Sequence, residues 1–397
     1  MAIRVGNKAE GNDFFDRVTE REEIWRLLEG NHILLSGPRR LGKTSLLQRL
    51  AEEAQEQGLL AKLVDVEGID TAGGFILALE HAFPDVTITG YLQSVGQKIS
   101  VGLDRIKGVK LNLPGGVGSE IEMQAKPDAG WADQAVRLQE RLSKAPLLIF
   151  IDEFSVFLEK LIAKDAADAE KFLGWLRAWR MNSNVACRFV FSGSIGFNSL
   201  LDRYKAGTRF NDCYDFRLGP FRLKAALQML AEEARREDWE GETPVLEHLC
   251  RRVGWLSPFY LNLLLVESIG AARDRELESG SSLHRLQISD VDDAYDRLLA
   301  TRSRFIHWYQ RLERDLEAPD FALALAVLNA SAKSEHGLTR NQLLSRLQRL
   351  EPDPDRRSAQ LNRILLKLEE DGYLNQADER IRFLSFLLRD YWKRNYG

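Results

Sequence analysis

The sequence has little of what stabilises small secreted proteins or builds metal centres. It contains only three cysteines, Cys187, Cys213 and Cys250, which lie far apart and form no CxxC pair. We therefore expect neither a disulfide framework nor a zinc site. We expect free buried thiols in a reducing compartment instead. His32 and His307 also lack metal-ligand spacing, so we expect ordinary packing or solvation of both.

Long apolar runs and a strong charge excess are absent as well. No stretch approaches the roughly 20 apolar residues that cross a bilayer, and the start, MAIRVGNKAEGNDFFDR, has no apolar core of signal-peptide length. We expect a cytoplasmic protein without membrane contact. The net charge of −4 and pI near 6.0 do not favour nucleic acid as a general partner, but they do not exclude a local basic patch.

What is present is a long chain of ordinary globular composition. Its 397 residues, 44% hydrophobic and 29% charged, predict two or three domains with sizeable cores. The pattern divides it into a core at 1–221 with an insertion at about 84–130, a helical lid domain at 222–316 and a winged-helix domain at 317–397.

Short apolar runs alternate with helical patterns in the first half. This alternation predicts a parallel α/β sheet covered on both faces. The expected strands lie within 32–35, 59–68, 146–154, 187–197 and 212–221. The glycine-rich insertion is either a surface excursion without chemistry or a partner-binding hairpin.

After Phe221 the pattern is helical. One long charged helix is expected over 289–316. The last ~80 residues predict three helices and a small hairpin, which is the pattern of a winged helix.

The sequence GPRRLGKT, residues 37–44, matches G-x-x-x-x-G-K-[ST] between an expected strand and an expected helix. Its glycines let several backbone N–H groups face one phosphate, and the helix N-terminus adds its positive end. Lys43 would reach the β- and γ-phosphates of ATP, and Thr44 would offer a hydroxyl to Mg²⁺. The predicted phosphate-binding residues are Gly37, Pro38, Arg39, Arg40, Leu41, Gly42, Lys43, Thr44 and Ser45.

The pattern leaves open what the side chains of two arginines in this loop do. Arg39 and Arg40 could neutralise phosphate charge, contact a neighbouring subunit, or point to solvent.

The apolar run PLLIFIDEF ends in two carboxylates. Asp152, at the C-terminal end of the expected strand, is predicted to hold the Mg²⁺ shell. Glu153 is predicted to polarise the attacking water as a general base; alternatively it caps the next helix.

Three further residues are candidates near a γ-phosphate. Ser192 or Ser194, in SGSIGF, is either a polar sensor or part of a capping turn. Arg209 is either an arginine finger for a neighbouring subunit or a solvated loop residue.

The segments FFDRVTEREEI, GPRRLGKTSLL, LLIFIDEF, FSGSIGF and GWLSPFYLNLL, in this order, resemble the archaeal-type ATPases of the AAA+/STAND branch of P-loop NTPases. The resemblance covers roughly residues 13–270 and implies ATP binding with hydrolysis. It places Phe15, Arg17 and Glu20 near the adenine and Pro258, in the lid, beside the base. No arginine stands where many AAA+ proteins carry a second sensor, which implies slow or partner-dependent hydrolysis.

The C-terminal part resembles the winged helix of archaeal origin-recognition initiators. Its basic residues Arg356, Arg357, Arg363, Lys367, Arg380 and Arg382 favour DNA binding. The acids Glu351, Asp353, Asp355, Glu369, Glu370 and Asp371 nearly cancel them, which favours a protein-docking module.

Three functions follow from these patterns. The first is a regulatory ATPase switch, in which nucleotide sets the position of lid and winged helix for a protein partner or a second copy. The alternative is an ATP-dependent DNA-binding loader. A small-molecule P-loop kinase leaves the Asp152–Glu153 pair, the lid and the winged helix unexplained.

Overall fold

The computed structural model describes residues 14–15, 17–84, 130–143, 145–182, 187–193, 197, 200–201, 204, 207–301 and 305–397. Its contacts divide the chain into two compact units. Of the described residues, those within 14–36 and 43–218 form the sheet unit, and those within 37–42 and 219–397 form the C-terminal unit. The insertion expected at about 84–130 lies, apart from its two end residues, outside the described residues.

The sheet unit is built on a five-stranded sheet in the order β2-β3-β4-β1-β5. All of its paired strands are parallel, which confirms the predicted α/β sheet. Because parallel strands share one direction, their carboxyl ends meet at the same edge. The strands are β1 (His32–Ser36), β2 (Leu60–Asp65), β3 (Leu147–Asp152), β4 (Cys187–Ser192) and β5 (Cys213–Arg217).

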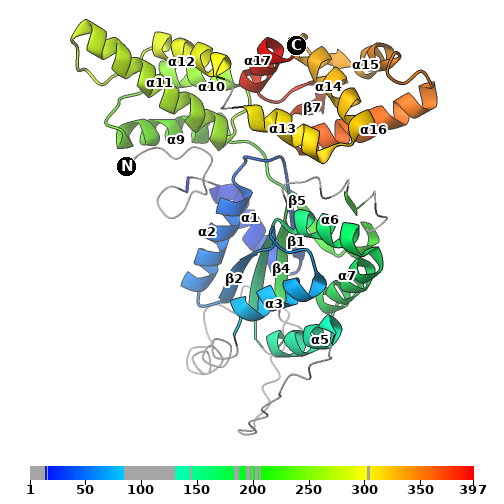
Figure 1. The fold of residues 1–397 in the computed structure, drawn as a ribbon. Coiled ribbons are helices and arrows are strands. Elements are labelled where there is room, and N and C mark those ends of the chain that lie inside the picture. Colours follow the sequence, from blue (N-terminus) through cyan, green and yellow to red (C-terminus); the bar gives the residue numbers. More distant parts are fainter. Residues whose placement is uncertain are drawn as a thin grey trace. The chain divides into compact units, whose positions relative to one another are not determined.

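Helices cover both faces of this sheet, with α1 and α2 on one side and α6 and α7 on the other (Figure 1). The central strands β1, β3 and β4 are accordingly buried along nearly their whole length, as the continuous apolar runs predicted. The helices are α1 (Val18–Leu28), α2 (Lys43–Glu56), α3 (Ala72–Ala82), α5 (Trp131–Leu142), α6 (Phe154–Lys164) and α7 (Ala166–Arg180), with a 3₁₀ turn, η3, at Gly207–Arg209.

Phenylalanine dominates the core on the α6 side. The ring of Phe154, which opens α6, lies 4.8 Å from that of Phe191 in β4 and 5.8 Å from that of Phe210. Aromatic pairs at these distances add about 0.5–1.5 kcal/mol beyond area burial. This packing fixes the start of α6 against the end of β4.

His32 lies in the core of the sheet unit with both ring nitrogens bonded. Its Nδ1 accepts from the N–H of Phe189 at 3.1 Å, so its Nε2 carries the proton and donates to the carbonyl of Arg180 at 3.1 Å. Burial lowers the pKa of His32 from 6.5 to about 4. The hydrogen bond to the Arg180 carbonyl and the charge of Asp212 oppose this shift, and the charges of Arg180 and Arg188 add to it.

Acid is therefore expected to destabilise the sheet unit through His32. Between pH 6.5 and about 4 the His32 side chain is protonated in the unfolded chain but neutral in the folded chain. The free energy of unfolding therefore falls as the pH falls, by about 3 kcal/mol in all. Denaturant unfolding at pH 7, 5.5 and 4.5 measures this. His32→Gln, which can still donate and accept, should flatten this dependence; an unchanged slope would contradict the assignment.

The C-terminal unit begins with four helices: α9 (Leu223–Arg236), α10 (Thr243–Val253), α11 (Pro258–Ser279) and α12 (Ile288–Ala300). The long helix expected over 289–316 is wrong, because α12 ends at Ala300 and α13 (Ile306–Asp315) follows as a separate helix. Thr301 has extended backbone (φ −94°, ψ 98°).

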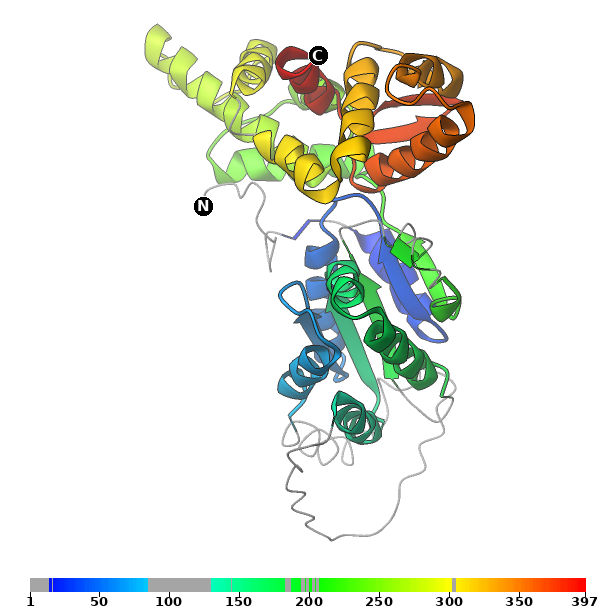
Figure 2. The same cartoon turned by 45° about the vertical axis from the view of Figure 1, so that its right-hand side comes forward.

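The remaining elements confirm the predicted winged helix (Figure 2). A three-stranded antiparallel sheet has the order β6-β8-β7, and Asp378 and Glu379, both with positive φ, form the two-residue turn between β7 and β8. Thr339 is the N-cap residue of the helix that begins at Arg340, and its side chain accepts from the N–H of Gln342. The elements are α14 (Ala318–Ala332), β6 (Leu338–Thr339), α15 (Arg340–Leu347), α16 (Pro354–Glu370), β7 (Leu374–Ala377), β8 (Arg380–Phe383) and α17 (Phe386–Asn395).

The three cysteines are free thiols, and burial raises the pKa of each above its ordinary value. Among the described residues, no helix has the length and apolar character that a membrane span requires.

Candidate functional site

The loop between β1 and α2 has the backbone of an anion-binding turn. Gly37, Arg40 and Gly42 have φ of 138°, 68° and 84°, a left-handed region that favours glycine. Loops that interleave such residues turn successive N–H groups toward one point. Arg40 is the non-glycine among the three, and this conformation costs it about 1–2 kcal/mol.

Helix α2 begins directly after the loop, at Lys43. No acidic residue lies in its first turn, so the positive end of its dipole is not offset there. Lys43 and Ser45 are buried and Thr44 is half-buried. The predicted phosphate ligands Lys43 and Thr44 therefore lie at a helix N-terminus, where an anion is favoured.

Asp152 ends β3 and is 2% exposed. One of its oxygens, Oδ1, accepts hydrogen bonds from the Ser192 hydroxyl and, at 3.1 Å, from the N–H of Glu153. Ser192 ends the neighbouring strand β4, so the pairing of two parallel strands brings these side chains together. The other carboxylate oxygen can take a cation, which suits the predicted Mg²⁺ role.

Glu153 follows in the left-handed conformation, with φ 55°, and stands at the N-cap position of α6. Its side chain makes no capping hydrogen bond, so helix capping does not account for this carboxylate. Phe154, directly after it, is fully buried and anchors the turn. Glu153 is thus an anchored acid in a left-handed conformation directly after the end of β3.

The second predicted sensor position, Ser194, lies outside the described residues. The sequence did not single out Gly193 or Ser155. A Cβ at Gly193 would lie 2.2 Å from Oγ and 2.7 Å from Cβ of Ser155, which is fully buried in the first turn of α6. The end of β4 and the start of α6 therefore touch at Gly193.

Arg209 lies in η3, and its guanidinium pairs with Glu170 of α7 at 3.3 Å. The guanidinium of Arg180 donates to the backbone carbonyl of Arg209. Action on a neighbouring subunit would require Arg209 to leave Glu170.

The predicted adenine residues lie at the start of α1. Arg17, 3% exposed, pairs with Glu20 at 2.7 Å. Phe15, two positions before Arg17, is half-buried. α1 packs against β1, the strand that leads into the phosphate loop.

The predicted lid residue Pro258 is the first residue of α11. Ser257, just before it, is fully buried and donates to the carbonyl of Arg40 at 2.6 Å. Residues 37–42 thus pack within the C-terminal unit, where Leu41 is 1% exposed and a Cβ at Gly372 would lie 3.2 Å from Pro38.

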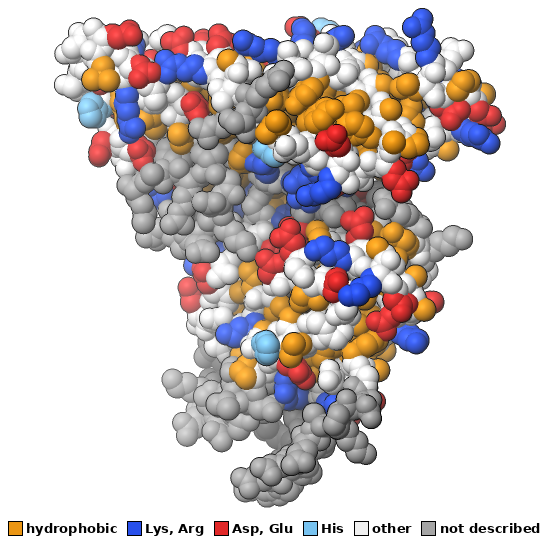
Figure 3. Space-filling model, viewed as in Figure 1, with side chains coloured by type: hydrophobic (Ala, Val, Ile, Leu, Met, Phe, Trp, Pro, Cys, Tyr) orange, Lys and Arg blue, Asp and Glu red, His pale blue; other side chains and the backbone are white. Residues whose placement is uncertain are grey.

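Four of the six predicted DNA-contacting residues have partners within the winged helix. Lys367 is buried against Asp371, Arg363 pairs with Asp320, and Arg357 and Arg380 bond backbone carbonyls. Arg356 and Arg382 are exposed. On the face drawn in Figure 3, basic and acidic side chains are interspersed, which does not favour DNA.

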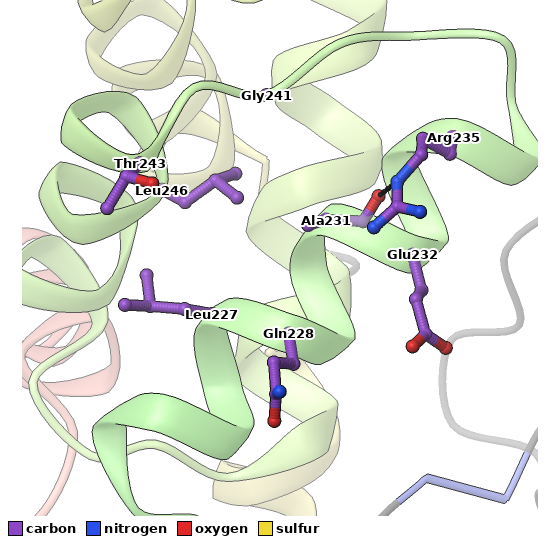
Figure 4. A pocket seen from close by; sticks show the side chains of 8 residues that line it. All are labelled: Leu227, Gln228, Ala231, Glu232, Arg235, Gly241, Thr243 and Leu246. Atoms are coloured by element: carbon purple, nitrogen blue, oxygen red, sulfur yellow. Dashed lines mark hydrogen bonds between the residues drawn. The ribbon is translucent and has the colours of Figure 1, made fainter.

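One surface pocket of about 320 Å³ lies between α9 and α10 (Figure 4). Gln228, Glu232 and Arg235 of α9 and Thr243 of α10 line it, and Arg235 bonds the carbonyl of Ala231. None of the predicted site residues belongs to it, so it adds nothing to the nucleotide site.

No family model and no curated protein matches the sequence. The solved structures that match the fold over nearly its full length include an ATPase and an ORC2 protein. A Walker-type ATPase of Pyrococcus abyssi is 17% identical, with a TM-score of 0.62 and coverage of 98% of this chain and 99% of that one. The ORC2 protein of Aeropyrum pernix, solved as ADPNP–ADP complexes, is 15% identical, with a TM-score of 0.54 and coverage of 99% and 98%. The chain therefore has the fold of these two proteins, with a P-loop parallel sheet followed by a helical region and a C-terminal winged helix.

Proposed function

We propose that the protein binds Mg²⁺·ATP, hydrolyses it to ADP and phosphate, and uses the nucleotide as a switch. The observation that carries this is Asp152, a buried carboxylate oriented by Ser192 and the Glu153 N–H. The same sheet unit holds Lys43 and Thr44 at the N-terminus of α2. The Pyrococcus and Aeropyrum structures, named as an ATPase and as nucleotide complexes, support this reading.

Each residue has one task in this proposal. The N–H groups of residues 37–42 and Lys43 bind the phosphates, and Thr44 and Asp152 hold Mg²⁺. Mg²⁺ held there would supply positive charge against the phosphate oxygens. Glu153 accepts a proton from the attacking water, and Ser192 keeps the Asp152 carboxylate in place.

The switch part of the proposal rests on the loop. Residues 37–42 continue from β1 into α2, yet they pack within the C-terminal unit. A phosphate that binds this loop therefore acts on residues of the C-terminal unit, and contacts that differ between nucleotide states would give this unit two states. The state would be sensed by a partner protein or a second copy of the chain. DNA is the alternative partner, through Arg356 and Arg382.

The test is a nucleotide titration and a phosphate-release assay on the purified protein. Lys43→Ala is expected to weaken ATP affinity about 10- to 100-fold, because the charge-assisted bonds of its ammonium are lost. Lys171→Ala, the same change at an exposed position on α7, should bind as the wild type does.

Other results would overturn parts of the proposal. Phosphate found on an added small acceptor, rather than in water, would identify a kinase. No nucleotide binding by the wild type would remove the proposal altogether. Stimulation of hydrolysis by duplex DNA, with an affinity that falls steeply with salt, would favour the loader.

A further inference from the structure

The side chain of Arg40 is held by two helices of the C-terminal unit. Its guanidinium carbon lies 3.6 Å from the centroid of the Phe259 ring, in α11, and 5.6 Å from that of Trp308, in α13. Its Nη2 contacts Nε2 of His307, also in α13. Stacking of a guanidinium on aromatic faces is a preferred arrangement for arginine.

The contact with His307 fixes the protonation state of the imidazole. Arginine has only donors, so Nε2 of His307 accepts and the ring is neutral. Burial, with the charges of Arg40 and Arg311, lowers the pKa of His307 to about 4. Burial also lowers the pKa of Arg40 to about 10, so Arg40 is still charged at neutral pH.

The backbone of Arg40 is held at the same place. Its carbonyl accepts from Ser257 Oγ at 2.6 Å, and its φ of 68° is unfavourable for a side chain. A left-handed residue at this point of the loop turns the neighbouring N–H groups toward one anion. The contacts of the side chain and the carbonyl therefore stabilise the conformation that phosphate binding needs.

We propose that Ser257, Phe259, His307 and Trp308 form an arginine cradle, which holds Arg40 so that the phosphate loop keeps its anion-binding conformation. Arg40 is then a positioning residue, and the C-terminal unit sets the affinity for nucleotide through it. This inference rests on the proposed function, since it concerns the regulation of the same loop.

Two substitutions at Arg40 separate the cradle from the alternatives. Arg40→Ala removes the cradle contacts but keeps the unfavourable φ, so ADP affinity should fall roughly tenfold or more. Arg40→Gly also removes the contacts but has no penalty at positive φ, so it should recover a large part of that loss. Direct phosphate contact by Arg40 predicts equal losses in both variants, because both remove the same charge.

A substitution at Phe259, in the arginine cradle, gives the second measurement of ADP affinity. Phe259→Leu keeps the bulk and removes the aromatic face, and it should weaken ADP affinity several-fold in the wild-type background. In the Arg40→Ala background the same change should have no further effect, since the guanidinium is already gone. Calorimetric titration with ADP measures all five proteins, and thermal unfolding verifies that each is folded.

The outcomes are distinct. The cradle is supported if ADP affinity decreases in the order wild type, Arg40→Gly, Arg40→Ala, and if the effects of Arg40→Ala and Phe259→Leu are not additive. Equal binding by Arg40→Ala and wild type, or equal losses in Ala and Gly, overturns the cradle and leaves the ATPase proposal intact. A wild-type protein that binds no nucleotide overturns both.

Discussion

Glu153→Gln is expected to abolish most ATP hydrolysis while it leaves nucleotide binding nearly unchanged. The amide has the shape of the carboxylate but cannot accept the proton of water, and loss of a general base lowers turnover by about 10²- to 10⁴-fold. Phosphate release under single-turnover conditions, with binding measured in parallel, tests this. Because Asp152 still accepts the N–H of residue 153, the substitution should not disturb the cation ligand.

A second variant at this position separates catalysis from folding. Glu153 has φ 55°, so Glu153→Gly should be as stable as the wild type or more stable, by about 1 kcal/mol, and equally inactive. An inactive but more stable variant would mean that the acid is kept at a cost in stability, as catalytic residues are. If Glu153→Gln hydrolyses ATP at the wild-type rate, another group is the base.

Gly193→Ala is expected to damage both stability and activity. The new methyl group would meet Cβ and Oγ of Ser155 at 2.7 and 2.2 Å, and overpacking of this kind costs about 1–3 kcal/mol. The end of β4 would have to move away from α6, and Ser192 would move away from Asp152. Hydrolysis should therefore fall together with the midpoint of thermal unfolding.

The compensating substitution makes this prediction specific. Ser155→Gly removes both close atoms, although its N–H still lies 3.2 Å from the added methyl. Ser155→Gly in the Gly193→Ala background should therefore restore part of the stability and of the activity. Independent, additive losses from the two changes would show that the contact does not matter.

Local patterns were enough for the parts of the fold that are determined locally. The buried run before Asp152 and the glycines around Lys43 specify a strand end and a helix start, whatever the rest of the chain does. The break after Ala300 had no such signal. Leu298, Phe305 and Leu312 are all buried and follow one another at seven-residue intervals, so the periodicity runs on through the break without glycine or proline.

The contacts around the site could not be predicted because they join distant residues. Arg40 contacts Phe259 and His307, which are more than 200 positions away. Nothing in the loop sequence indicates which residues pack against Arg40. The resemblance placed Pro258 beside the base but gave no role to Ser257, the residue before it. The pairing of Arg209 with Glu170 is likewise a product of packing between α7 and η3.

The placement of tryptophan around the phosphate loop gives the protein an optical property. Trp308 lies 5.6 Å from the charge of Arg40, and Trp255 has its ring beside Gly372, next to Pro38. Indole emission depends on nearby charge and on solvent, so these two residues report on the loop without any label. Trp175 and Trp179 are packed against each other in the sheet unit, 5.4 Å apart, and their emission follows the integrity of that unit instead. Tryptophan-to-phenylalanine replacements would separate the two signals.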